Sequence, residues 1–254
     1  MAITSPGNDP VPGPAAPGPE REPQVTRLST MRRRIGAHML ASVSTSPHVA
    51  MSVEVDFSGV DAVRAVQGPP WREREGSSLT YLPFIASALC RAIAAFPVVN
   101  SSIVGDALHV YPYVHLGIAV DLDHQGLVVP VIRDADRLPV ADLARAAARL
   151  AQQARARKLG PDDFAGGTYT LTNNGRTTYF TTPIINQPQV AILSSDSVTR
   201  RPVVIDEADT IAVRPVGLLT QSFDHRAFDG AYSAAFLGRL KQELEGRDWS
   251  GELL

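Results

Sequence analysis

The residues that could carry chemistry lie near the end of the chain, in the octet Asp224-His225-Arg226-Ala227-Phe228-Asp229-Gly230-Ala231. Histidine takes and returns a proton near neutral pH, and His225 is followed four residues later by the carboxylate of Asp229. By spacing alone, this pair is compatible with a structural histidine and with a general base. The octet lies between an apolar run at 216–219 and a stretch of helical periodicity, so a turn between a strand and a helix is expected to carry it.

The second candidate is the hydroxyl of Thr172, which follows a strand-like run at 167–171 and precedes the turn signal Asn173-Asn174-Gly175. A threonine at the end of a strand is usually a turn residue, and the sequence around it must supply any further role. A hydroxyl at such a place can also donate a hydrogen bond to a carbonyl oxygen on which negative charge develops. Thr172 is therefore expected at the junction of a strand and a turn.

The octet resembles the HxxxDG signature of the acyltransferases that include chloramphenicol acetyltransferase. It is more similar to the DHRxxDGA motif of the acyltransferase component of 2-oxo-acid dehydrogenase complexes. Other stretches resemble the same family: LSTMRRRIGAHM at 28–39, GIAVDLDHQGLVVPV at 117–131, GGTYTLTNNG at 166–175 and PIINQPQ at 183–189. The resemblance therefore extends from about Val25 to the C-terminus.

The resemblance implies acyl transfer between thiols. In this interpretation His225 takes the proton of coenzyme A, whose sulfur attacks an acyl thioester, and Thr172 donates to the developing oxyanion. Coenzyme A is then a substrate, and a lipoyl group is the other acyl carrier. The resemblance also implies that Asp229 is mainly structural and pairs with Arg32, so that the loop of the histidine is held in place.

The resemblance further implies a homotrimer whose active sites lie between subunits, with the histidine from one chain and the hydroxyl from the next. Apolar C-terminal residues at 249–254 would join trimers into a larger cubic or icosahedral assembly. A lipoyl domain and dehydrogenase components are possible partners. The two lysines, Lys158 and Lys241, are not flanked like a lipoylation site, so the lipoyl group is expected to be supplied in trans.

Several alternatives stay open. The chain is either a catalytic core cut from a longer protein or a stand-alone protein that accepts its acyl donor in trans. A stand-alone acyl-CoA-dependent acyltransferase acting on a small amine, alcohol or thiol would use the same catalytic residues. A catalytically silent scaffold is a third possibility, which the intact octet and Thr172 argue against. The turn after Gly175 is shorter than the family pattern and lacks a second glycine, which affects the entrance for the acyl donor.

Composition excludes several classes of protein. The formal charge of -2 gives no basic footprint for nucleic acid, and no apolar run approaches the ~20 residues that span a bilayer. The single cysteine, Cys90, lies in an apolar helical pattern and suits a reducing compartment, so a cytoplasmic protein is expected. No metal site is expected, because the remaining histidines lack cysteine or carboxylate partners at metal-ligand spacing.

The elements that must position these residues can be placed by periodicity. Residues 1–26 hold seven prolines and are predicted to be a disordered Pro/Ala-rich tail or linker, and 27–254 to be the acyltransferase catalytic domain. Ser29 is expected to cap a first helix that Pro47 ends. The other principal predictions are helices at 58–66, 81–96, 143–158 and 231–245, a polar connection at 68–78, and strands at 49–56, 114–120, 167–171, 190–194 and 216–223. Their irregular order predicts an α+β two-layer sandwich, a mixed β-sheet covered by helices. The resemblance implies that this fold is chloramphenicol acetyltransferase-like.

Overall fold

The protein is represented by a computed structural model that describes residues 23–175 and 177–253. Most of the tail predicted at 1–26 lies outside these residues. In chain order the helices and strands are α1 (Thr30–Thr45), β1 (His48–Asp56), α2 (Ser58–Glu75), α3 (Leu82–Ala95), β2 (Ser101–Val104), β3 (Ala107–Val110), β4 (Leu116–Ile118), β5 (Val120–Asp121), β6 (Leu127–Val128), β7 (Val131–Ile132), α4 (Val140–Arg155), β8 (Tyr169–Asn173), β9 (Ala191–Ser195), β10 (Thr199–Val204), β11 (Ile211–Asp224) and α5 (Gly230–Gly246).

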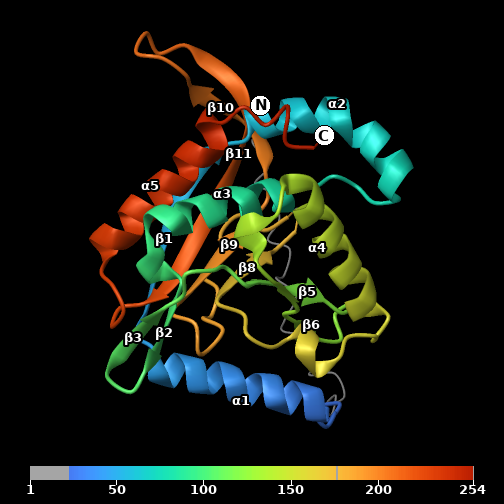
Figure 1. The fold of residues 1–254 in the computed structure, drawn as a ribbon, viewed down its shortest axis with the longest axis vertical. Helices are drawn as coiled ribbons and strands as arrows, with labels where there is room; N and C mark the ends of the chain where they lie inside the picture. Colours follow the sequence, from blue (N-terminus) through green and yellow to red (C-terminus); the bar gives the residue numbers. More distant parts are fainter. Residues whose placement is uncertain (1–22, 176, 254) are drawn as a thin grey trace, which may run out of the picture.

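The main sheet is mixed. Its strands follow the order β1-β11-β9-β8-β4-β7, and β10 pairs with β11. Strand β8 runs parallel to β9 and β4, whereas the other pairs of the sheet are antiparallel. Helices α3, α4 and α5 lie in front of this sheet in Figure 1, and α1 crosses below it. The predicted α+β sandwich with a mixed sheet covered by helices is confirmed.

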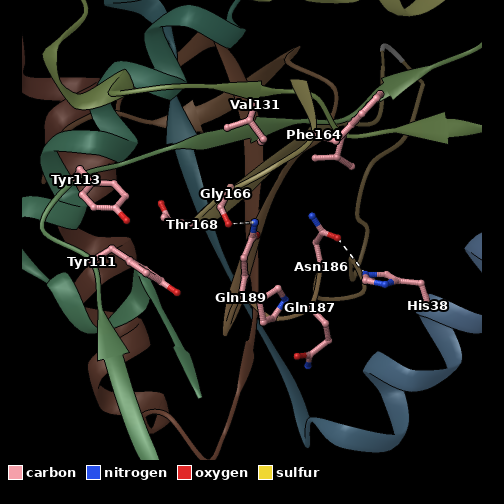
Figure 2. Close-up of a pocket in the computed structure, with 14 residues that line it drawn as sticks. His38, Tyr111, Tyr113, Val131, Phe164, Gly166, Thr168, Asn186, Gln187 and Gln189 are labelled. Carbon is pink, nitrogen blue, oxygen red and sulfur yellow. Dashed lines mark hydrogen bonds between the residues drawn. The ribbon is translucent and has the colours of Figure 1, made fainter. Parts of the chain in front are cut away.

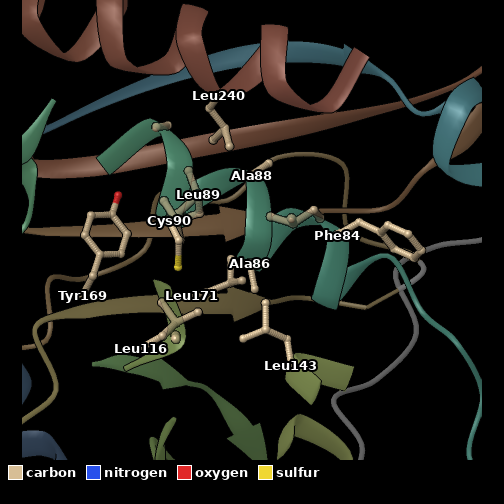
Figure 3. Close-up of a cluster of buried hydrophobic side chains, with 14 of the residues drawn as sticks. Phe84, Ala86, Ala88, Leu89, Cys90, Leu116, Leu143, Tyr169, Leu171 and Leu240 are labelled. Atoms are coloured by element: carbon tan, nitrogen blue, oxygen red, sulfur yellow. The ribbon is translucent and has the colours of Figure 1, made fainter. Parts of the chain in front are cut away.

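The hydrophobic core lies between the sheet and the helices on its front face. Helix α3 is buried along most of its length, as its apolar sequence predicts, and Phe84 and Leu89 project from it. Figure 3 shows Leu116 and Leu171 of the sheet beneath Cys90 and Ala86 of this helix. Burial raises the pKa of the Cys90 thiol to about 12, so this cysteine is a packed core residue.

Helix α2 is longer than predicted. The sequence predicts a helix that ends at Val66 and a polar connection from Gly68, but the helix continues through Pro69 and Pro70 to Glu75. Trp71 supplies the physical reason, because its side chain is only 2% exposed and Arg145 of α4 lies 5.5 Å from its ring centroid. Tertiary burial of a large aromatic side chain thus opposes the cost of about 3 kcal/mol that a proline imposes on a helix interior.

Other differences are smaller. The strand predicted at 114–120 is divided into β4 and β5, and the last strand begins at Ile211 rather than Val216 because it pairs with β10. Helix α4 ends at Arg155, and the left-handed residue after it is Arg157 rather than a glycine. Ser29 caps α1 as predicted, accepting a hydrogen bond from the backbone N–H of Arg32 at 3.1 Å.

The C-terminal segment packs against its own chain. Trp249 is 1% exposed, lies edge-on to Phe84 with ring centroids 5.4 Å apart, and donates from Nε1 to the carbonyl oxygen of Leu244. Leu253 is buried as well. The expectation that apolar residues of this segment join trimers is therefore wrong for Trp249 and Leu253, because the core of the same chain already covers them. Leu254 lies outside the described residues.

Candidate active site

His225 lies in a tight turn between β11 and α5. The backbone N–H of Ala227 donates to the carbonyl oxygen of Asp224 at 2.9 Å, which closes the turn, and His225 occupies its second position. The backbone N–H of His225 donates to the carbonyl oxygen of Pro47 at 3.0 Å. The imidazole is exposed and stacks on Phe223 at 5.9 Å between ring centroids. The turn therefore holds the backbone of the histidine and leaves its ring accessible.

The carboxylate of Asp224 is the buried anchor of this turn. Its side chain accepts from the backbone N–H of Arg226 at 2.9 Å and from the Arg226 guanidinium at 2.7 Å. Burial pushes the pKa of Asp224 upward, but hydrogen bonds from Arg226 and Ser46 outweigh burial and hold the pKa below its usual value. The octet thus contains an ionised, buried aspartate directly before the exposed histidine.

Asp229 has a different role from the expected one. It caps α5, and its Oδ1 accepts from the backbone N–H of Tyr232 at 3.0 Å. No ion pair between Asp229 and Arg32 forms within the described chain. Arg32 is exposed in the first turn of α1, whereas the His225 turn contacts Pro47 beyond the other end of that helix. These two ends are roughly 20 Å apart, at 1.5 Å per helical residue. The predicted pairing of Asp229 with Arg32 is therefore wrong within one chain.

Thr172 lies inside strand β8 rather than in a turn, and its side chain is 9% exposed. The side chains of Tyr169 and Leu171 enter the core, so the alternation of a strand places Thr170 and Thr172 on the opposite face. The Thr172 hydroxyl lies 3.4 Å from Oδ1 of Asn174, at the long limit of a hydrogen bond. A hydroxyl held this weakly can rotate toward a substrate.

Asn174 connects Thr172 to a buried carboxylate. Its Nδ2 donates to Asp196 Oδ1 at 3.2 Å, and the hydroxyl of Thr181 donates to the same oxygen at 2.9 Å. Thr178 Oγ1 donates to the carbonyl oxygen of Asn174 at 3.0 Å. These contacts tie the segment after Gly175 to the end of β9. The turn after Gly175 is shorter than the family pattern, so the sequence did not define the shape of the expected acyl-donor entrance. In the structure, side-chain hydrogen bonds hold this segment in place.

The sheet face that carries Thr172 is polar across four strands. The register aligns Thr172 of β8 with Ser194 of β9, Thr220 of β11 and Ser52 of β1. The hydroxyls of Ser52 and Thr220 lie 2.8 Å apart. A row of hydroxyl side chains is typical of a sheet face that contacts a substrate or a polar neighbour. A sheet face that packed against a second hydrophobic core would carry apolar side chains instead.

A cavity of about 380 Å³ lies on this same face. It is bounded by α1, by the segment after β3 and by residues before β9, as Figure 2 shows. His38, Asn186 and Gln189 supply polar groups, and Phe164 and Val131 supply apolar surface. This volume and mixed lining are typical of small-molecule sites.

Hydrogen bonds organise the polar side of the cavity. Thr170 Oγ1 donates to Gln189 Oε1 at 2.7 Å, and Gln189 Nε2 donates to the carbonyl oxygen of Gly167 at 3.0 Å. His38 Nε2 lies 3.2 Å from Asn186 Oδ1. Gly117 has no room for a side chain, because a Cβ there would lie 2.8 Å from Val129. The cavity wall is therefore largely preformed.

His225 and Thr172 are not brought together within one chain. Thr172 is in register with Thr220, and His225 lies five residues further along the chain and two strands away. Strand spacings place the two residues roughly 15–20 Å apart. The structure thus presents two separate halves of the expected site, an exposed imidazole and a hydroxyl on the sheet face that also carries the cavity.

The residues that sequence reasoning missed are those that support the two halves: Ser46, Asp196, Gln187 and Asn174. They come from separate segments, and no spacing rule connects them. Asp224 could have been suspected from its place in the octet. Among the described residues, no three His, Cys, Asp or Glu side chains gather so that they could hold a metal ion. The described helices include none with both the length and the apolar character that a membrane span requires.

The chain is similar to known proteins over most of its length. A family model described as 2-oxoacid dehydrogenases acyltransferase (catalytic domain) matches residues 20–250. The dihydrolipoyllysine-residue succinyltransferase component of the 2-oxoglutarate dehydrogenase complex of Bartonella vinsonii is 37% identical over 89% of this chain and 54% of that protein. The acetyltransferase component of the pyruvate dehydrogenase complex of Mycobacterium bovis is 38% identical over 90% of this chain and 42% of that protein. The chain thus spans about half the length of these curated relatives.

Solved structures agree with these relatives. A probable dihydrolipoamide acetyltransferase from Listeria monocytogenes aligns with a TM-score of 0.86 and 36% identity, covering 90% of this chain and 97% of that one. The cubic core of a pyruvate dehydrogenase multienzyme complex aligns with a TM-score of 0.81 and 33% identity, covering 88% and 91%. Chloramphenicol acetyltransferase, at 14% identity and a TM-score of 0.51 over 82% and 94%, shares the fold. This chain belongs to the family of 2-oxo-acid dehydrogenase acyltransferase catalytic domains.

Proposed function

We propose that this chain transfers an acyl group between dihydrolipoamide and coenzyme A. One observation carries the proposal: an exposed histidine in a rigid turn, and a hydroxyl on the sheet face that also carries a preformed cavity, occur in a chain of this acyltransferase family. Coenzyme A and the lipoyl group are substrates, and the lipoyl group is supplied in trans. Relatives act on different acyl groups, since one is a succinyltransferase component and another an acetyltransferase component.

In the proposed reaction, His225 takes the proton from the thiol of coenzyme A, whose pKa of about 8.5 makes the neutral thiol a weak nucleophile. The sulfur then forms a bond to the carbonyl carbon of the acyl dihydrolipoamide thioester, and negative charge develops on the carbonyl oxygen. Thr172 donates a hydrogen bond to that oxygen. The bond to the dihydrolipoamide sulfur breaks, and His225 returns the proton to that sulfur.

We also propose that each site is formed by two chains of a homotrimer, His225 from one and Thr172 from its neighbour. The separation of roughly 15–20 Å within one chain supports this proposal, because direct transfer requires both groups at the same carbonyl. The similarity to a cubic core supports a larger assembly of such trimers. Dehydrogenase components and a lipoyl domain would be partners of that assembly.

The test is an assay of acyl exchange on the purified chain. Acetyl-CoA or succinyl-CoA is mixed with dihydrolipoamide or with a panel of small amines, alcohols and thiols, and free coenzyme A and acylated acceptor are quantified by mass spectrometry. Acylated dihydrolipoamide is the expected product, and the His225→Ala protein is the control. Exchange confined to a small amine, alcohol or unrelated thiol would instead support a stand-alone acyl-CoA-dependent enzyme. No exchange with any acceptor would contradict both.

A further inference from the structure

One wall of the cavity is a segment without regular secondary structure. Residues 185–189 lie between β8 and β9, and Asn186, Gln187 and Gln189 of this segment line the cavity in Figure 2. No helix or strand ladder holds the backbone of such a segment, so its shape depends on hydrogen bonds to other parts of the chain. The residues that supply these bonds therefore determine whether the cavity is preformed.

His48, the first residue of β1, binds the beginning of this wall through its ring. The backbone N–H of Ile185 donates to His48 Nε2 at 3.1 Å, and His48 Nδ1 lies 2.8 Å from the carbonyl oxygen of Ser46. Ile185 is completely buried, whereas His48 is half-buried. The wall is thus joined to the start of β1 by one imidazole ring.

The two partners fix the protonation state of the ring. A carbonyl oxygen only accepts, so Nδ1 of His48 carries a proton and donates it to Ser46. A backbone N–H only donates, so Nε2 must keep its lone pair for Ile185. These are the contacts of a neutral imidazole. A proton on Nε2 would place two donors against each other and would leave the N–H of a buried residue without an acceptor, which costs as much as a lost hydrogen bond.

We propose that neutral His48 is a positioning residue for the cavity wall, and that protonation of its ring loosens this wall and weakens the binding of dihydrolipoamide. The inference rests on the proposed function. Of the two substrates, dihydrolipoamide suits a lining without Lys, Arg, Asp or Glu, because it is small and uncharged whereas coenzyme A carries phosphates. A wall that is loose in the free protein must be ordered during binding, and this ordering reduces affinity.

The groups that titrate beside His48 on β11 can be separated from it. Asp224 lies opposite His48 in the strand register and forms an ion pair with Arg226 at 2.7 Å. This pair stays charged at mildly acidic and neutral pH, because a carboxyl titrates near about 4 and a guanidinium above about 12. His225 follows directly and donates from its backbone N–H to Pro47, and its ring changes charge in the same range as that of His48. A His225→Ala background removes this second titration.

The other elements around His48 contribute one further titratable group. The wall at 183–189 has no charged residue, and within β1 the first one is Glu54, six positions beyond His48. On α1, His38 Nε2 lies 3.2 Å from Asn186 Oδ1. A protonated His38 can still donate to this oxygen, so its titration leaves the contact with the wall intact.

Two substitutions of His48 divide the contacts of the ring. The side chain in His48→Gln is long enough for Oε1 to reach the position of Nε2, so it can accept from Ile185 without titrating. The shorter side chain in His48→Asn can donate to Ser46 but supplies no acceptor for Ile185. Ser42→Ala is the matched control, because the Ser42 hydroxyl donates to the carbonyl oxygen of Ile185 at 2.7 Å and its loss leaves the titratable ring in place.

Calorimetry of dihydrolipoamide binding to His225→Ala protein, at about pH 7.5 and about pH 5.5, tests the inference across the range in which histidine changes charge. The ligand stays mostly uncharged at both values, because thiols titrate near about 8.5. Kd should rise about 3- to 10-fold at the lower pH, the factor that corresponds to one hydrogen bond. Added His48→Gln should abolish this rise, added His48→Asn should raise Kd at both values, and added Ser42→Ala should keep the rise. A Kd that is independent of pH in the His225→Ala protein, or that rises equally with His48→Gln, would overturn the inference.

Hydrogen exchange measured by mass spectrometry gives a second readout that requires neither substrate nor a substitution. After correction for the intrinsic effect of pH on exchange, the peptide that contains Ile185 should lose protection between about pH 7.5 and about pH 5.5 in the wild-type protein. The same peptide in His48→Gln should stay protected. Unchanged protection in the wild type would contradict a positioning role for His48.

The outcomes separate this inference from the proposed function. A chain that exchanges acyl groups, but whose wall protection and Kd do not depend on pH, overturns the inference alone. A chain without acyl exchange overturns the proposed function and dihydrolipoamide as the ligand of the cavity. A loss of wall protection at low pH that His48→Gln abolishes would still support the positioning role of His48 in that chain.

Discussion

His225 is exposed, whereas the carboxylate directly before it is buried, and this contrast separates reactivity from stability within the octet. The exposed imidazole contributes little to the stability of the fold, so a variant without it tests the catalytic role of the side chain. The Asp224 carboxylate accepts hydrogen bonds from the backbone N–H and the guanidinium of Arg226, so its removal tests the turn. The two neighbouring residues are therefore expected to respond in opposite ways to substitution.

His225→Ala should lower turnover by roughly 10²- to 10⁴-fold, the usual contribution of a general base. The melting temperature should stay close to that of the wild type, because the side chain is exposed and the hydrogen bond to Pro47 comes from the backbone N–H, which the variant keeps. Steady-state kinetics of acyl exchange and thermal melting measure the two effects. Near-wild-type turnover would eliminate the proposed mechanism.

Thr172→Ala should reduce kcat on the order of 10²-fold, whereas Thr172→Ser should keep most of the activity because the hydroxyl is the group that donates to the oxyanion. The comparison uses the same assay under saturating substrate. A serine variant as impaired as the alanine variant would show that the methyl group, rather than the hydroxyl, matters at this position.

Asp224→Asn should destabilise the protein in a pH-dependent way. The folded-state pKa of Asp224 lies below its usual value of 3.8, so its stabilising contribution is present above that pH and is lost as pH falls through the folded pKa. At neutral pH the variant should lose about 1–3 kcal/mol, the range for hydrogen bonds to a charged group. Thermal melting at several pH values should show the difference shrinking below pH 3.8. A difference that is constant with pH would contradict this assignment.

Among the elements, the C-terminal segment after α5 is part of the core of its own chain. Trp249 covers Phe84 of α3, and Arg91 of the same helix lies 3.7 Å from the carboxylate of Glu252. This segment therefore packs against both α3 and α5. Trp249 and Leu253 are covered by their own chain, and the assembly role of the segment as a whole stays a prediction.

Trp249→Ala should lower the free energy of unfolding by about 3–5 kcal/mol, the usual cost of removing a large buried aromatic side chain. Deletion of residues 249–254 should have a similar or larger effect on melting. Ser250→Ala, at an exposed position in the same segment, is the matched control. Sedimentation of the deletion variant distinguishes the alternatives, since a stable trimer with an unchanged melting temperature would restore the assembly role.

Across the whole molecule, the two halves of the site lie on separate parts of one chain. His225 is carried beyond the end of β11, and Thr172 lies within β8, beyond the intervening β9. A closed ring of identical chains can bring His225 of each chain to Thr172 of its neighbour.

Co-expression of His225→Ala and Thr172→Ala chains should therefore restore activity that neither variant has alone. With random mixing in equal amounts, about one junction in four pairs an intact His225 with an intact Thr172, so about a quarter of wild-type activity is expected. Differently tagged chains and tandem purification remove the homotrimers; each remaining mixed trimer has one intact junction in three, so about a third of wild-type activity is expected in the purified sample. Mixed trimers without recovery would show that both residues act within one chain.

The sequence by itself determined the elements and the chemistry-bearing residues. Alternation in 49–56 and apolar periodicity in 81–96 predict β1 and α3 closely, because each pattern reports which face is buried. The octet places His225 in a turn before a helix, as observed. Local signals were sufficient wherever burial follows a single short period.

Only the tertiary structure decided the features that depend on distant neighbours. Helix α2 passes through two prolines because Trp71 packs beside α4, and Asp229 caps α5 instead of pairing with Arg32 because α1 separates them by its length. Likewise, the hydrogen bond from Gln187 to Ser46 joins two segments that are far apart in the sequence. No local period encodes such contacts, because they are set by how the sheet and helices are packed together.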